Sequence, residues 1–281
     1  MAVDFAPERW DRIRDNYRRW WAGEFKRPLI QLTLKGRDPG RPEPKLPYYG
    51  NAAHYGLSLS PEAIVDRWDY DLSCREYLGD AFQAANVNFG PGIVGGFLGS
   101  RVTTSDETTW FDVPTGGSIA DLHFRYDAGN AWLKRVKEVS RTAAKQFKGR
   151  AQVNMTDLGG SVDVLSAFRP GEELLYDLYD RPEEVKRLTW EIHELWWRYF
   201  GEIDEVLREG NLGYTSWAPI FSEEPYYMFQ CDFCYMIGPV MFDKFIKPEL
   251  AASCRRIPHA FYHLDGEKQL PHLDSLLAIP H

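Results

Sequence analysis

The stretch that decides the fold runs from Gly213 to Leu277 and reads GYTSWAPIFSEEPYYMFQCDFCYMIGPVMFDKFIKPELAASCRRIPHAFYHLDGEKQLPHLDSLL. Its aromatic start, at 212–217, ends in polar residues, and a second apolar run at 260–263 leads into His263, Asp265 and Glu267. Parallel β/α folds build active sites in this way, because each strand delivers polar groups at its carboxyl end. We therefore expect the functional site at the ends of these two strands.

Upstream of this stretch, apolar runs alternate with segments of helical periodicity. The apolar runs predict strands at 29–34, near 87–89, and at 151–155, 212–217 and 260–263. The periodic segments and their start signals predict helices over 7–21, from 61, and over 131–147, 171–178, 182–209, 240–255 (with a kink at Pro248) and from about 271. The polar, turn-rich segment 103–119 predicts an excursion of short strands.

Repeated strand-then-helix order without strand hairpins favours a parallel sheet. Five such units favour a TIM-type (β/α)8 barrel, an α/β fold, that stops after about five βα units. We expect residues 1–281 to form a single barrel domain that is incomplete at its C-terminal end. Residues 1–27 are expected to form a helix that packs on the barrel.

Composition narrows the classes of partner. The net charge of -8 provides no basic surface for nucleic acid, while 44% hydrophobic and 15% aromatic residues can fill a core and wall a pocket. No apolar run reaches the roughly 18 residues of a membrane span, and four cysteines are not a disulfide framework. We expect a cytoplasmic protein, monomer or homodimer, that acts on a small-molecule substrate.

The tripeptide His263-Leu264-Asp265 is the sharpest chemical signal in the chain. Residues i and i+2 of a strand point the same way, so the imidazole and the carboxylate converge. That geometry suits two ligands of one zinc ion, or a histidine with an orienting carboxylate, or a histidine hydrogen-bonded in a polar barrel top. Cys231 and Cys234 form a single C-x-x-C, which predicts buried, inert thiols or an additional ligand.

Further polar residues fall at the predicted ends of other strands. Asn88, Asp157 and Ser216 would join the same mouth. Gly90 to Gly95 fits the pattern G-x-G-x-x-G, but a poor helix former follows it, so we interpret it as a tight loop.

Several segments together resemble the uroporphyrinogen decarboxylase superfamily. Residues 214–218 (YTSWA) are similar to its D-S-W-A-G-like strand end, and 237–248 (IGPVMFDKFIKP) to its S-P-x-x-F-x-x-F-x-x-P segment. Residues 168–175 and 182–185 are also similar to that family. The resemblance implies a (β/α)8 barrel and one of two chemistries: decarboxylation of uroporphyrinogen without a cofactor, or methyl transfer involving a corrinoid protein and a zinc ion.

The two branches of the superfamily differ in their motifs. The decarboxylase branch carries R-Q-A-G-R-Y after its first strand, where this chain has Leu34 to Asp38, and Asn88 takes the place of its catalytic aspartate. The methyltransferase branch carries H-x-C where this chain has His263-x-Asp265. The resemblance therefore implies a corrinoid-dependent methyltransferase, with a corrinoid (cobalamin) as substrate or as the cofactor of a partner protein. The alternatives are a lyase that decarboxylates a tetrapyrrole or another carboxylated substrate, and a non-catalytic corrinoid or tetrapyrrole binding protein.

In this interpretation each candidate residue has a role. His263 and Asp265 hold zinc, with Cys231 or Cys234 as an alternative ligand, and His263 takes part in catalysis. Asp157 and Asp232 position the substrate or transfer a proton. The residues expected to bind substrate are Asn88, Tyr214, Ser216, Trp217, Phe221 and Glu267.

Overall fold

The computed structural model describes residues 6–105, 108–113 and 117–280. The chain divides into two compact units, and each is built from three separate stretches. Unit 1 comprises Met1–Asn88, Arg135–Thr156 and Ile203–Tyr226, and unit 2 comprises Phe89–Lys134, Asp157–Glu202 and Tyr227–His281. Residues 106–107 and 114–116 of the predicted excursion lie outside the described residues.

Helices follow the sequence signals closely. Ser60 accepts a hydrogen bond from the Ala63 N–H at 3.3 Å and so caps α2 (Pro61–Ser73). Asn130 caps α4 (Ala131–Phe147) by accepting from the amides of Trp132 and Leu133. The other helices are α1 (Pro7–Trp21), α3 (Val94–Phe97), α5 (Ser161–Phe168), α6 (Glu173–Asp180), α7 (Pro182–Leu207), α8 (Pro239–Phe245), α9 (Lys247–Cys254), α10 (Leu273–Leu277) and the 3-10 turns η1 (Ala52–Tyr55), η2 (Ile119–Asp121), η3 (Asp232–Met236) and η4 (Glu267–His272). The predicted helix at 240–255 is two helices, which break at Ile246 before Pro248.

The strands do not form the predicted barrel. Within the described ranges they make two-stranded sheets only. The pairs are β1 (Gln31–Lys35) with β2 (Arg75–Gly79), β3 (Ala84–Ala85) with β6 (Gln152–Val153), β4 (Arg101–Thr104) with β5 (Thr109–Asp112), and β7 (Tyr226–Gln230) with β8 (His259–His263). The prediction of a TIM-type (β/α)8 barrel is therefore wrong.

Two features of the strands account for the error. β1 pairs antiparallel with β2, a strand of polar composition that follows α2 directly, whereas a barrel requires parallel neighbours. The aromatic run at 212–217 is not a strand, because the chain turns at Pro219 and bridges Tyr214 to Ser222. β3 and β6 do pair in parallel, but over two residues each.

The core of unit 1 is an aromatic cluster. The rings of Trp10, Tyr17, Phe82 and Phe221 lie 5.8 to 6.2 Å apart in tilted and edge-on pairs. Such pairs stabilise a core beyond the area they bury. Near them the side chain of Asp80, 1% exposed, accepts hydrogen bonds from Arg27, Asn16 and the Ile30 N–H.

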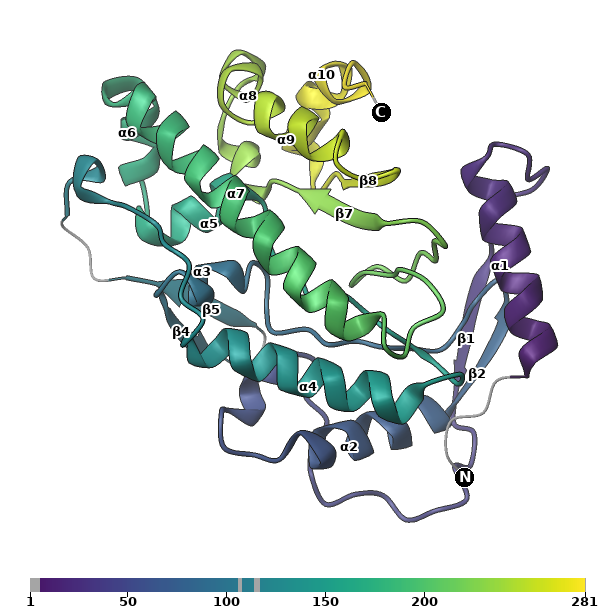
Figure 1. The fold of residues 1–281 in the computed structure, drawn as a ribbon. Coiled ribbons are helices and arrows are strands. Elements are labelled where there is room, and N and C mark those ends of the chain that lie inside the picture. Colours follow the sequence, from purple (N-terminus) through teal and green to yellow (C-terminus); the bar gives the residue numbers. More distant parts are fainter. Residues whose placement is uncertain (1–5, 106–107, 114–116, 281) are drawn as a thin grey trace. The chain divides into compact units, whose positions relative to one another are not determined.

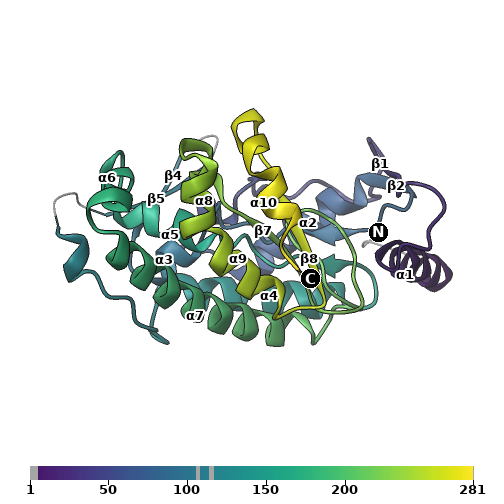
Figure 2. The same ribbon diagram turned by 90° about the horizontal axis from the view of Figure 1, so that it is seen from above.

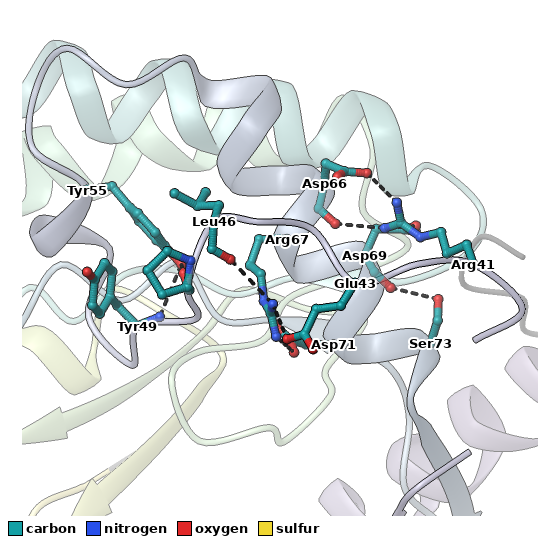
Figure 3. A network of polar contacts seen from close by, with 11 residues as sticks. Arg41, Glu43, Leu46, Tyr49, Tyr55, Asp66, Arg67, Asp69, Asp71 and Ser73 are labelled. Atoms are coloured by element: carbon teal, nitrogen blue, oxygen red, sulfur yellow. Dashed lines mark hydrogen bonds and ion pairs between the residues drawn. The ribbon is translucent and has the colours of Figure 1, made fainter. Parts of the chain in front are cut away.

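A network of ion pairs holds the loop before α2 in unit 1 (Figure 3). Arg67 donates two hydrogen bonds to Asp71, and it also pairs with Glu43 at 2.6 Å and donates to the Leu46 carbonyl. Arg41 bridges Asp66 and Asp69 at 2.7 and 3.2 Å. The long segment between β1 and η1 is thereby tied to α2 through Arg41, Glu43 and Leu46 (Figure 3).

Unit 2 surrounds the larger part of α7, whose buried positions include Val185, Leu188, Ile192 and Tyr199, all fully enclosed. α3 and α5 lie beside β5 (Figure 1). The C-terminal elements η4, α8, α9 and α10 gather in one region of the same unit (Figures 1 and 2). No helix among the described residues is both long enough and apolar enough to cross a membrane.

Candidate functional site

The centre of unit 2 is the segment 157–163, which links the end of β6 to α5. The Leu158 N–H donates to the Tyr227 hydroxyl at 2.8 Å, and the indole N–H of Trp196 donates to the Gly159 carbonyl at 2.9 Å. Gly159 has a φ of +75°, and a Cβ there would lie 2.6 Å from the Cα of Gly92. The segment predicted as a tight loop at 90–95 thus approaches a second backbone closely at Gly92, and the short helix α3 begins within it at Val94.

Asp157 is buried at the start of this segment. Its carboxylate accepts from the Gly159 N–H at 2.8 Å and from the side-chain amide of Gln230 at 3.2 and 3.3 Å. Burial raises the pKa of Asp157 to about 6, although these hydrogen bonds favour its ionised form. The residue therefore titrates near neutral pH.

Asp163 is a second acidic group, which the sequence prediction missed. It stands in the first turn of α5, where it accepts from the Gly160 N–H at 3.3 Å and from the Phe233 N–H at 2.7 Å. Burial, followed by the negative charge of Asp232, raises the pKa of Asp163 to about 7. Its carboxylate therefore joins α5 to η3 and carries a proton for part of the time at neutral pH.

A pocket of about 610 Å³ opens over α5, η3 and the start of η4. Its volume is in the range of pockets that bind drug-sized molecules. We call it the acidic pocket, because aspartates and aromatic rings share its wall. Its lining residues are Pro91, Thr109, Trp110, Phe111, Asp163, Ser166, Ala167, Pro170, Gly171, Asp232, Phe233, Tyr235, Met236, Asp265 and Gln269.

Asp232 and Asp265, in the wall of this pocket, are both exposed to solvent, whereas Asp163 is partly buried. Partial burial of its carboxyl raises the pKa of Asp232, the negative charge of Asp265 raises it further, and His263 lowers it. The structure thus brings together three residues that the sequence nominated: Asp232, His263 and Asp265. It adds Asp163 to the group.

The thiols of Cys231 and Cys234 are buried beside the pocket and hydrogen-bonded to each other. This hydrogen bond raises the pKa of Cys231 and lowers that of Cys234. The Tyr262 hydroxyl lies 3.8 Å from the Cys234 sulfur, and the Gln269 amide donates to the Cys231 carbonyl at 3.3 Å. These contacts fix η3, and with it Asp232, against β8 and η4.

The predicted zinc site does not receive a full set of ligands. Within the described ranges, no group of three or more His, Cys, Asp or Glu side chains is arranged to hold a metal ion. Structural zinc sites use four protein ligands and catalytic sites use three. We therefore derive no chemical step through zinc.

The other predicted residues are distributed differently. Asn88, Tyr214, Ser216, Trp217 and Phe221 belong to unit 1. Phe221 is a member of the aromatic core, and the buried Ser216 hydroxyl donates to the Ala218 carbonyl and the Tyr226 hydroxyl. Glu267 begins η4 in unit 2, where it is exposed. Their proposed contacts with a substrate stay predictions.

A second pocket in unit 2 has a volume of about 260 Å³ and a mostly apolar lining. Its lining includes Phe229, Leu250, Leu276 and the Cys254 thiol, whose pKa burial raises to about 11. A thiol with such a pKa stays protonated and unreactive at neutral pH. The acidic pocket, rather than the apolar one, therefore has the groups for acid–base chemistry.

No model of a protein family matches the chain, and no curated protein matches it in sequence.

Proposed function

We propose that the acidic pocket of unit 2 is the active site of a small-molecule enzyme, in which Asp232 transfers a proton to or from the substrate. The observation that supports this most strongly is the position of Asp232 in the pocket wall, with Asp163 and Asp265 around it. Carboxylates that repel one another do not all ionise together, so the raised pKa of Asp232 favours its protonated form. A general acid needs that property.

Within this site each aspartate has a distinct task. Asp232 touches the pocket and exchanges a proton with the substrate. Asp265 supplies the negative charge that opposes ionisation of Asp232, while His263 stabilises the ionised form once the proton has left. Asp163 is anchored by two backbone N–H groups, and burial followed by the charge of Asp232 raises its own pKa.

Of the two reactions that the sequence resemblance implies, the pocket favours methyl transfer. Three aspartates repel a polycarboxylated tetrapyrrole, and the pocket's volume suits a drug-sized molecule rather than a macrocycle. When a methyl group leaves an oxygen atom, the electron pair of the broken C–O bond stays on oxygen, and the proton of Asp232 would pass to it. The acceptor, a corrinoid held by a partner protein, remains a prediction from the resemblance, and no step is derived through it.

The first experiment measures the ionisation of Asp232 directly. Carbon-13 carboxyl NMR of the protein, assigned with Asp232→Asn, should show a titration above the usual range of aspartate near 4. The Asp265→Asn variant should lower that midpoint, because it removes a repelling charge. A midpoint of about 4 in the unaltered protein would contradict the assignment of Asp232 as the acid.

The second experiment tests turnover. The protein is incubated in D₂O with a panel of O-methylated, N-methylated and carboxylated compounds, with methylcobalamin and its demethylated form supplied separately. Proton NMR then follows methyl loss and new C–D bonds. Activity should fall at least about 100-fold in Asp232→Asn and persist in Asp274→Asn, an exposed aspartate of α10. Turnover that survives in Asp232→Asn would exclude the proposed role, and a lack of any turnover would favour a binding protein.

The proposed compartment is the cytoplasm. All four cysteines are free thiols, which suits a reducing compartment.

A further inference from the structure

We propose that the acidic pocket selects a substrate with an organic cation, of the alkylammonium class. This inference depends on the proposed active site and adds what that site binds. Asp163, Asp232 and Asp265 all line the pocket and give it a negative field. Burial, and after it the charge of a neighbouring aspartate, raises the pKa of both Asp232 and Asp163. A bound cation would relieve the same repulsion, so its binding and the ionisation of the aspartates favour each other.

Aromatic rings in the same wall specify the kind of cation. Trp110, Phe111, Phe233 and Tyr235 line the pocket beside the aspartates. Alkylammonium groups bind to the faces of such rings, and cages of aromatic side chains are the usual way in which proteins hold them. A hydrated inorganic cation would use the carboxylates but gain little from four rings. The combination therefore favours an organic cation over a metal ion.

The chain itself places an ammonium group against one of these rings. The Nζ of Lys268 lies 4.9 Å from the centroid of the Tyr235 ring. Lys268 is exposed at the start of η4, next to the pocket residue Gln269. Its side chain is thus an intramolecular stand-in for a ligand cation, and shows that the Tyr235 ring is accessible to an ammonium group.

The test compares two probes that differ in charge alone. Choline has a trimethylammonium group and a hydroxyl, and 3,3-dimethyl-1-butanol replaces that nitrogen with carbon. Titration of the full chain by ligand-observed NMR at pH 7.5 should show choline binding about tenfold more tightly or better. Equal affinity for both probes, or no binding of choline, would overturn the proposal.

Four variants locate the binding. Asp265→Asn and Tyr235→Leu should each weaken choline binding about threefold to tenfold and leave the binding of the neutral alcohol almost unchanged. Lys268→Met should tighten it, because a competing cation is removed, and Asp274→Asn is the matched exposed control. A further outcome would overturn the role of the aromatic rings. If Mg²⁺ or Ca²⁺ displaces choline, and Tyr235→Leu does not change the affinity for choline, the cation site lies away from the rings.

Failure of this inference can be distinguished from failure of the proposed function. A high titration midpoint for Asp232, together with equal binding of both probes, would leave the acid in place and remove the ammonium substrate. A midpoint near 4 with selective choline binding would leave a cation-binding pocket without the proposed proton transfer.

Discussion

The side-chain amide of Gln230 donates from one nitrogen to both carboxylate oxygens of Asp157, at 3.2 and 3.3 Å. Gln230 is the last residue of β7, and Asp157 begins the segment that leads into α5. Both side chains are buried, and neither lines the acidic pocket. The pair therefore joins β7 to the segment before α5 within unit 2, and the predicted role of Asp157 toward a substrate stays a prediction.

Buried acids with raised pKa values give the stability a definite dependence on pH. Asp157 and Asp163 titrate near 3.8 when unfolded, but at about 6 and about 7 when folded. The folded state therefore binds more protons between these values, and the free energy of unfolding should fall as pH rises from 4 to 7. Each group contributes a slope of up to about 1.4 kcal/mol per pH unit within its own range. Urea denaturation at intervals of half a pH unit measures the slope.

Two substitutions show which aspartate produces each part of this pH dependence of stability. Asp157→Asn should remove its own part of the slope, which ends at about pH 6, and Asp163→Asn should remove the part that extends to about pH 7. Asp274→Asn, at an exposed position, should leave the profile unchanged. A stability that rises from pH 4 to 7 would contradict the raised pKa values.

Asp80 in unit 1 should show the opposite pH dependence. The hydrogen bond from Arg27 holds the pKa of Asp80 below its usual value, with help from Ile30 and Asn16. Its contribution is present above pH 4 and is lost as pH falls below that. Asp80→Ala should cost about 2 to 3 kcal/mol at pH 7, because it removes the acceptor of a buried backbone N–H and a charged hydrogen bond. Asp11→Ala, at an exposed ion pair, is the control and should cost little.

Arg67 should control access to the loop before α2. Its guanidinium, with 8% of the side chain exposed, holds Asp71, Glu43 and the Leu46 carbonyl together, as Figure 3 shows. Lysine cannot reproduce that fork of donors. Arg67→Lys should therefore raise the thermolysin cleavage rate at 43–49 severalfold, whereas Arg101→Lys, at an exposed pair with Asp112, should not. Equal cleavage rates in Arg67→Lys and in the unaltered protein would show that the network does not hold the loop.

Two glycines should respond to alanine in opposite directions. Gly201 lies inside α7, and a Cβ there meets nothing within 4 Å, so Gly201→Ala should stabilise the protein by about 0.5 to 1 kcal/mol. Gly210 follows the same helix, but its Cβ would lie 2.0 Å from the backbone oxygen of Ala144. Gly210→Ala should therefore destabilise the protein by about 2 kcal/mol or more. Thermal unfolding of both variants checks the two signs.

Helices were predictable because their signals are local. The Ser60-Pro61 start, the bounds of α4 and the buried stripe of α7 all depend on residues within a few turns of one another. Strands were less predictable, because the pairing of a strand depends on partners far along the chain. All five residues of β1 are exposed, and its partner β2 reads REYLG, which has no alternation of apolar and polar residues. The antiparallel pair, and with it the failure of the barrel, could not be foreseen from either segment alone.

The residues of the candidate site also divide into those that a local sequence signal predicts and those that only long-range contacts reveal. Asp232, His263 and Asp265 follow or end an apolar run, so a strand-end rule found them. Asp163 was missed because the sequence analysis predicted no helix at 161–168, so nothing marked this acid, which stands in the first turn of α5. Its importance comes from the Phe233 N–H and from Asp232, about 70 residues away.

The interleaving of the two units also sets an order of events during protein synthesis. The aromatic cluster of Trp10, Tyr17 and Phe82 receives its last member, Phe221, from the final stretch of unit 1. A ribosome adds about 5 to 20 residues per second, so the first 88 residues wait roughly 7 to 28 seconds for that stretch to be made. During this interval the rings of Trp10 and Phe82 lack the partner that covers them. The nascent chain therefore leaves part of this apolar cluster uncovered until Phe221 has left the ribosome.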